Sequence, residues 1–247
     1  MAPNASVCIY QARKQLCTSG AAFELHVPEL ELLPGSVTVV AGRSGCGKTT
    51  LLDVLGCIAE FTDCKRFEFC SDGKQVDMLR ASSRRKAALR RSSLGYVLQQ
   101  GGLLGFLTAW ENILLPLRMS GRMHLAASAR ELAAQLGVES ELNKLPAALS
   151  VGQRQRVSVV RALAPRPAVL LADEPTGALD PLTAQDVSRH LVEYARQQGA
   201  TVAVVTHDVE LFGPVADVRM GFELSRESAT VHSVLVPYTE PERRAEA

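Results

Sequence analysis

A nine-residue stretch, GRSGCGKTT from Gly42 to Thr50, constrains the possible folds of this chain most strongly. It follows an apolar run, Ser36 to Ala41, and precedes a helix-like run, Leu51 to Ala59, so the local order is strand, glycine loop, helix. Its spacing matches G-x-x-x-x-G-K-[ST], in which glycines let backbone N–H groups turn towards a polyphosphate at a helix N-terminus. The pattern favours nucleotide binding over the alternative, a glycine turn with a chance lysine.

Two side chains of this loop have defined roles in nucleotide binding. Lys48 is expected to reach the β- and γ-phosphates, and the hydroxyl of Thr49 is expected to hold Mg²⁺. Cys46 lies near Lys48 at a helix N-terminus, where the pKa of a thiol falls, so we expect maleimide to label it and ATP to protect it. The loop residues predicted to bind the nucleotide are Gly42, Ser44, Gly45, Cys46, Gly47, Lys48, Thr49 and Thr50.

The composition is typical of a folded protein with one α/β core and an additional subdomain. Of 247 residues, 47% are hydrophobic and 21% are charged, and the net charge of +1 does not call for a nucleic acid partner. No apolar run approaches the roughly 20 residues that span a bilayer, and the six cysteines show no paired spacing, so we expect a cytoplasmic chain with reduced thiols. One dense basic cluster favours a solvated helix face over a contact with anionic lipid or nucleic acid: Arg80, Arg84, Arg85, Lys86, Arg90 and Arg91.

Short strands flank the glycine loop on both sides. Ser6–Tyr10 and Phe23–Val27 are predicted as strands joined by a polar connection from Gln11 to Gly20. Arg66–Cys70 alternates apolar and polar residues, and Ser71-Asp72-Gly73 then predicts a hairpin turn. Together they predict an antiparallel β flank.

An apolar run of buried-strand type, Pro167 to Ala172, stops at Asp173-Glu174. In a chain that already has a phosphate loop, Asp173 is suited to Mg²⁺ and Glu174 to orienting or deprotonating a water. Another buried run, Thr201 to Val205, ends just before His207. Because the carboxyl ends of parallel strands meet at one edge of a sheet, we expect these polar groups to form one site.

A helical pattern covers Thr108 to Leu145, and Thr108 can cap its first helix with Glu111 at the third position. Further on, Ser150 is an N-cap candidate for a helix that runs to Ala164. That helix end can bind an anion, although the segment on its own favours a merely capped helix.

In this order and spacing, the motifs resemble those of the nucleotide-binding subunit of ATP-binding cassette (ABC) transporters, from about Ser6 to Leu224. The glycine loop is similar to Walker A and residues 149–153 are similar to the family signature. The remaining matches are Gln99 with the Q-loop glutamine, Asp173 and Glu174 with the Walker B aspartate and catalytic glutamate, 178–180 with the D-loop, and His207 with the switch histidine.

The resemblance implies the fold and its division. It implies a P-loop NTPase with a RecA-like core, an antiparallel β flank and an inserted helical subdomain, as a single ABC ATPase domain over residues 1–247. The core would cover about 1–99 and 150–236, and the helical subdomain about 100–149. Residues 237–247 are expected to be a disordered tail.

The resemblance also implies an ATPase that closes head to tail with a second subunit around two ATP molecules. Ser150, Gly152 and Gln153 would complete the partner's site, and Asp180 would join them in nucleotide binding. Val151 stands where the signature usually has its first glycine. The implied catalytic residues are Glu174, His207 and Gln99, and the implied Mg²⁺ ligands are Thr49, Gln99 and Asp173.

An aromatic residue upstream of the loop is expected to stack on adenine. Tyr10 and Phe23 are both candidates, and we assign the role to Tyr10.

The sequence from Tyr96 to Ile113 looks like the group whose ATPases drive lipoprotein release and macrolide efflux. This implies a membrane permease subunit as partner, a homodimer or a pair with a second ABC subunit, and a position on the inner face of the cell membrane. Leu103, Leu104 and Phe106 are then candidates for docking the permease. The alternative function is a mechanical or regulatory ABC module without transport.

Overall fold

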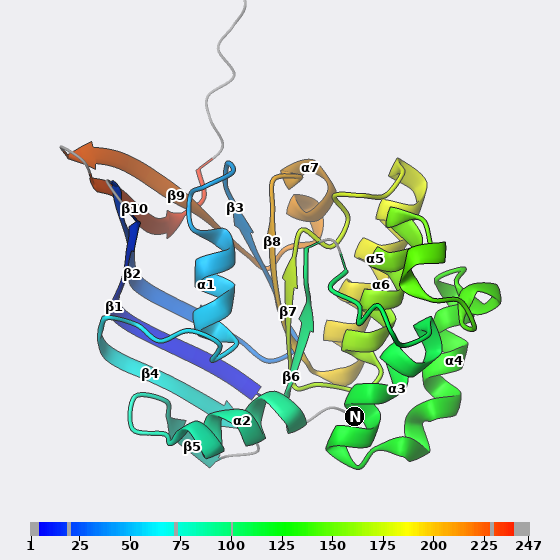
Figure 1. Cartoon of the computed structure of the whole chain (residues 1–247). Coiled ribbons are helices and arrows are strands. Elements are labelled where there is room, and N and C mark those ends of the chain that lie inside the picture. Colours follow the sequence, from blue (N-terminus) through cyan, green and yellow to red (C-terminus); the bar gives the residue numbers. More distant parts are fainter. Residues whose placement is uncertain (1–4, 19–20, 72–73, 100, 228–229, 240–247) are drawn as a thin grey trace, which may run out of the picture.

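The computed structural model describes residues 5–18, 21–71, 74–99, 101–227 and 230–239. These residues form a ten-stranded sheet in the order β5-β4-β1-β2-β10-β9-β3-β8-β7-β6, which curls around α1 on one side and is covered by helices on the other (Figure 1).

Antiparallel strands form one half of the sheet, as expected from the sequence. They are β1 (Ala5–Thr18), β2 (Ala21–Leu32), β4 (Asp63–Ser71) and β5 (Lys74–Asp77). The predicted polar connection from Gln11 was wrong, because β1 continues through it to Thr18. Gln11 has a φ of 49° and no partner in the register, so the strand bulges there and goes on with polar residues facing solvent. Of the predicted hairpin turn, 72–73 lie outside the described residues.

Two strands near the end of the chain join the flank to the core. They are β9 (Val218–Glu227) and β10 (Thr230–Pro237), which pair antiparallel with each other. Strand β10 runs parallel to β2 and strand β9 parallel to β3. The sequence predicted a disordered tail from residue 237, but Pro237 is the last residue of β10 and pairs with Met220 of β9. Residues 240–247 of that predicted tail lie outside the described residues.

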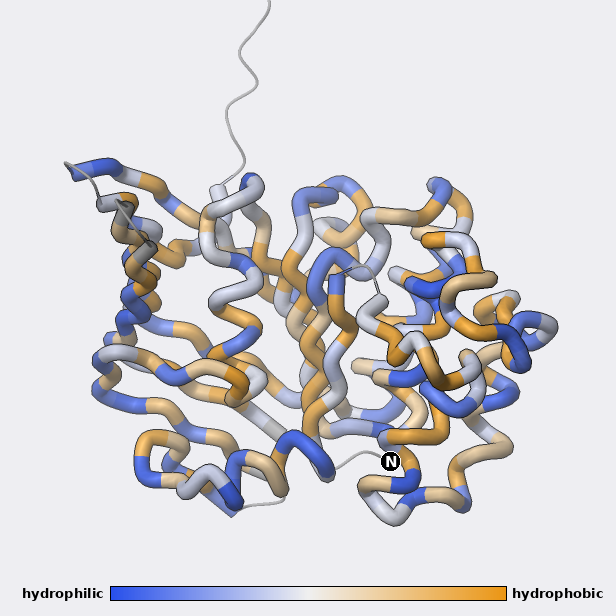
Figure 2. The backbone as a smooth tube through the Cα atoms, viewed as in Figure 1, coloured by the Kyte–Doolittle hydropathy of each residue, from blue (hydrophilic) through white to orange (hydrophobic). Residues whose placement is uncertain are grey.

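Four parallel strands form the other half of the sheet. They are β3 (Val37–Ala41), β6 (Leu94–Val97), β7 (Val169–Asp173) and β8 (Thr201–Thr206). Every residue of β3, β7 and β8 is buried, which explains why these segments are continuous apolar runs. Figure 2 shows the resulting hydrophobic centre.

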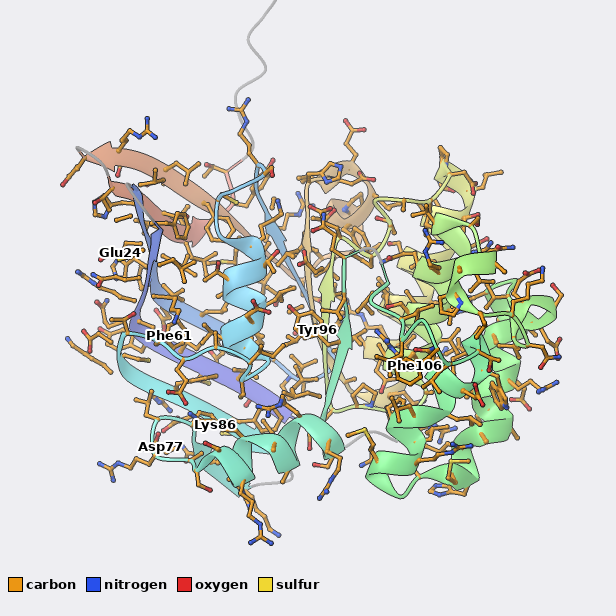
Figure 3. The ribbon with its side chains drawn as sticks, in the orientation of Figure 1. Glu24, Phe61, Asp77, Lys86, Tyr96 and Phe106 are labelled. Carbon is orange, nitrogen blue, oxygen red and sulfur yellow. The ribbon has the colours of Figure 1, made fainter. Side chains whose placement is uncertain are left out.

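Helices pack on both faces of this parallel half. They are α1 (Lys48–Leu55), α2 (Ser83–Ser92), α5 (Val151–Leu163), α6 (Pro181–Gln198) and α7 (Val209–Phe212), followed by a short 3₁₀ turn at Gly213–Val215. One apolar core packs α1 between the parallel strands and the flank, where the Tyr96 hydroxyl donates to Asp53 at 3.3 Å (Figure 3). A second core packs α5 and α6 against the opposite face. The helical run predicted to continue to Ala59 is shorter, because α1 ends at Leu55 with Gly56 as its C-cap. Cys57 then has a φ of 55°, which is not helical.

A helical subdomain is inserted between β6 and α5. It contains α3 (Ala109–Ser120) and α4 (Ala126–Gln135), with 3₁₀ turns at Met123–Leu125, Glu139–Glu141 and Pro146–Ala148. The predicted capping box is confirmed, since Thr108 Oγ1 accepts from the Glu111 N–H and the Thr108 N–H donates to the Glu111 carboxylate. No helix in the described part of the chain is long and apolar enough to cross a membrane.

Candidate nucleotide-binding site

A cavity of about 1060 Å³ opens where β3, β7 and β8 end. This is the edge at which open α/β sheets bind ligands. Of the residues expected to bind nucleotide or metal, the cavity is lined by Ser44, Gly45, Gly47, Lys48, Thr49, Thr50, Gln99, Asp173, Glu174 and His207.

The phosphate loop holds its lysine in a fixed position. The Lys48 ammonium donates to the carbonyl oxygens of Gly42 at 2.7 Å and Arg43 at 3.2 Å, and it lies 3.5 Å from Glu174 Oε1. Gly47 has a φ of 101°, and a Cβ there would lie 2.9 Å from the ring of Phe23. Glycine is therefore required at 47 both by backbone conformation and by space.

Cys46 faces the protein interior rather than the cavity. Its side chain is 1% exposed, and its carbonyl accepts a hydrogen bond from Ser233 Oγ at 2.6 Å. Burial raises the pKa of the Cys46 thiol, outweighing the opposite effect of the nearby Lys48 ammonium. The expectation of a low thiol pKa was wrong, because the loop turns this side chain inward. The carbonyl oxygen of Gly42 accepts a hydrogen bond from Lys48. Neither Gly42 nor Cys46 lines the cavity.

Oxygen donors for a hard cation lie together at the end of β7. The Thr49 hydroxyl donates to Asp173 Oδ2 at 2.8 Å, and Gln99 lines the same cavity. Asp173 is 3% exposed, and burial raises its pKa. A set of hydroxyl, carboxylate and amide oxygens fits Mg²⁺, which keeps waters and takes further ligands from phosphates. Among the described residues, no cluster of three or more His, Cys, Asp or Glu side chains is arranged to hold a metal ion.

Glu174 is held by contacts to the last residue of β8, Thr206, and to the residue after it, His207. Its Oε2 lies 2.8 Å from His207 Nδ1 and accepts from the His207 backbone N–H and the Thr206 hydroxyl, each at 3.3 Å. Glu174 also has a φ of 46°, an uncommon conformation that is found at functional sites. Thr206 was missed by the sequence reasoning, although its place between a buried strand and His207 was a signal.

The apolar wall of the cavity comes from the flank. Leu16 of β1 and Phe23 of β2 line it, whereas Tyr10 does not. Tyr10 is 46% exposed and pairs with Glu29 and Arg66 in the adjacent strands. It precedes Leu16 by six residues, which is about 20 Å along a strand. Of the two candidates for adenine stacking, Phe23 therefore lies at the cavity, and Tyr10, to which the sequence analysis gave the role, does not.

The sequence of the chain also matches the model of a known protein family. Residues 25–177 match the model of a family described as ABC transporter. The chain belongs to the ABC transporter family. The resemblance noted in the sequence is confirmed.

Several relatives and solved structures agree with this membership. The lipoprotein-releasing system ATP-binding protein LolD of Ruegeria sp. (strain TM1040) is 40% identical over 196 residues, covering 78% of this chain and 84% of that protein. The macrolide export ATP-binding/permease protein MacB of Syntrophobacter fumaroxidans is 38% identical over 75% of this chain, which spans 26% of MacB.

The solved dimer of the ATP-binding cassette MJ0796 in a post-hydrolysis state with ADP and Pi has a TM-score of 0.77 and 30% identity. The match covers 87% of this chain and 93% of that one. The expected P-loop NTPase fold and ABC-type ATPase class are thereby confirmed.

The signature segment, residues 149–153, and Asp180 contribute little to the wall of the cavity. Ser150 and Gln153 form a capping box at the start of α5, with bonds of 2.8 and 3.1 Å, and Asp180 caps α6 through the Thr183 N–H at 3.1 Å. None of the four predicted residues of this half lines the chain's own cavity, whereas Val151, 48% exposed, does. The four are Ser150, Gly152, Gln153 and Asp180.

Proposed function

We propose that this cassette hydrolyses ATP to ADP and phosphate and thereby powers a separate membrane permease. One observation carries the proposal: the cavity brings together Lys48 at the start of α1, the adjacent Asp173 and Glu174 at the end of β7, and His207 after β8, with His207 against Glu174. Ammonium, carboxylates and imidazole at the mouth of a phosphate loop are the groups that phosphoryl transfer to water needs.

The chain's own residues supply the chemistry in distinct ways. Lys48 places positive charge where the γ-phosphate would lie, which stabilises the charge that develops on transfer. Glu174 orients the attacking water and accepts its proton, while His207 and Thr206 hold the carboxylate in place. Thr49, Asp173 and Gln99 would hold Mg²⁺, which neutralises phosphate charge when bound. Phe23 would stack on adenine.

The exposed half of the site supports a second subunit. Ser150, Gly152, Gln153 and Asp180 lie outside the chain's own cavity, so they would face the ATP of a partner cassette. The first helical N–H groups of α5 would then approach the γ-phosphate from the opposite side. The partner would be a second copy or another ABC subunit, and the solved MJ0796 cassette is itself dimeric.

Exposed apolar side chains after β6 support a permease partner. Phe106 is 78% exposed and Leu104 is 38% exposed, and Figure 3 shows Phe106 on the side of the molecule formed by the helical subdomain. Leu103 instead packs partly against the core. The names of LolD and MacB, which speak of lipoprotein release and macrolide export, favour export or extrusion. A permease partner would place the cassette at the inner face of the cell membrane.

Charge placed on this surface tests the proposal. Phe106→Asp should abolish co-purification with a membrane subunit from detergent extracts and leave ATP turnover of the isolated chain unchanged. Leu224→Asp, on β9 and 49% exposed, is the matched control and should retain both.

The docking assignment is contradicted if Phe106→Asp loses both co-purification and ATP turnover, or if it retains both. Reconstituted in liposomes, the complex should hydrolyse ATP faster when a transported substrate is present. A complex that forms but shows no substrate stimulation favours the alternative, a mechanical or regulatory module.

A further inference from the structure

Gln155, in the second turn of α5, is a buried polar side chain without a partner. It is 1% exposed, and neither its Nε2 nor its Oε1 has a hydrogen-bond partner in the described part of the chain. Burying an amide without a partner costs free energy, so an unpaired buried carboxamide requires an explanation. Gln155 also lines the nucleotide cavity, together with Gln99, Asp173 and Glu174. The unpaired amide therefore belongs to a residue of the cavity wall.

The segment that carries Gln99 is fastened along α5. A Cβ on Gly101 would lie 3.1 Å from the Arg154 carbonyl oxygen, so the segment runs directly against the backbone beside Gln155. Two turns further on, the Arg161 guanidinium donates to the carbonyls of Gly101 at 2.9 Å and Gly102 at 2.8 Å. The loop after β6 is thus fixed to α5 beyond Gln99, whereas Gln99 itself is exposed in the cavity.

We propose that Gln155 is a positioning residue whose carboxamide pairs with that of Gln99 when ATP and Mg²⁺ fill the cavity. Two glutamine amides are complementary, because each offers N–H donors and a carbonyl acceptor. The pair would hold Gln99 towards the metal site and would connect it to α5, the helix whose first turn faces the partner cassette. The inference rests on the proposed function, since it requires ATP in the cavity.

Gln155→Met tests the proposal because methionine keeps the length of the side chain and removes both polar atoms. Without nucleotide, the thermal midpoint should rise by about 2–4 °C, since an unpaired buried amide is removed. ATP turnover should fall about tenfold, with KM changed by less than about twofold. A merely structural glutamine would instead give a lower midpoint and an unchanged kcat.

A double-mutant cycle with Gln99→Ala measures the pairing itself. If the two amides interact, the double variant should lose no more turnover than Gln99→Ala alone. Additive losses, an unchanged kcat in Gln155→Met, or a lower midpoint would each overturn the proposal. Gln155→Leu replaces the methionine variant if that protein does not fold.

Ser158→Ala is the matched control. Ser158 is also buried on α5 with an unpaired hydroxyl, but it does not line the cavity. Its variant should show a higher midpoint and wild-type turnover.

Absence of turnover in the wild-type chain would contradict the proposed function separately. In that case the pairing is tested by the rise in thermal midpoint that ATP causes. Gln155→Met should reduce this rise, and an unchanged rise would overturn the pairing.

Discussion

The two halves of the nucleotide site differ in how complete they are within one chain. Lys48 and His207 each contact Glu174 from a different segment, and Thr49 donates to the neighbouring Asp173. Ser150 and Asp180, in contrast, are exposed, and within the described part of the chain their side chains bond at the starts of their own helices. The first half is preorganised by the fold, whereas the second half, in the function we propose, is completed by a partner cassette. On that proposal, one chain holds the groups for hydrolysis in place, and hydrolysis depends on the approach of a second chain.

Removing the carboxylate of the completed half should have the largest effect. Glu174→Gln should lower ATP turnover by about 10²–10⁴-fold, because a water is no longer deprotonated, while ATP affinity is retained. Phosphate release and equilibrium nucleotide binding measure the two quantities. Glu193→Gln, an exposed site on α6, is the control and should match the wild type. Turnover above a tenth of the wild-type rate in Glu174→Gln would contradict the role of Glu174.

The contact between Thr49 and Asp173 should matter next. Thr49→Val keeps the shape of the side chain but removes the hydroxyl that donates to Asp173. Turnover should fall roughly 10- to 100-fold and require more Mg²⁺, because a ligand oxygen and a hydrogen bond to a charged group are lost. A Mg²⁺ titration of phosphate release checks this, and Thr49→Ser should restore the wild-type curve. An unshifted Mg²⁺ requirement in the valine variant would remove Thr49 from the metal site.

The apolar wall distinguishes the two aromatic candidates. Phe23→Ala should weaken ATP binding about tenfold, since stacking on a base is lost, whereas Tyr10→Ala should leave it unchanged. Fluorescent-nucleotide titration measures both affinities. The reverse order would restore the original assignment to Tyr10.

The smallest expected effect concerns stability without nucleotide. Because burial raises the pKa of Asp173 above its ordinary value of 3.8, the folded chain binds more protons than the unfolded chain between the two pKa values. Stability therefore falls as the pH rises through that interval. Asp173→Asn should raise the thermal midpoint at pH 7, and the gain should disappear below about pH 4. Asp186→Asn, exposed on α6, should show no such gain, and a pH-independent gain in Asp173→Asn would contradict the cause.

The completed half was also the more predictable half. Walker A, Asp173 and His207 are local patterns at the ends of apolar runs, so their convergence follows from the rules of parallel sheets. Such patterns do not reveal the bulge at Gln11 or the length of β1. Both features determine which aromatic residue lies at the cavity, and it is Phe23 rather than Tyr10. The inward turn of Cys46 and the unpaired amide of Gln155 depend on packing across distant segments. Local motifs predicted the family and fold, and side-chain direction required the structure.

The most direct test of the central claim is the mass of the Glu174→Gln chain in solution, measured by light scattering after size exclusion with and without ATP and Mg²⁺. We expect the mass of one chain without nucleotide and of two chains with it. Ser150→Arg should abolish the ATP-dependent dimer, because the larger side chain blocks the exposed half. A single-chain mass with ATP demonstrably bound, unchanged when Val151→Gly restores the usual signature glycine, would contradict the claim that a second cassette completes the site.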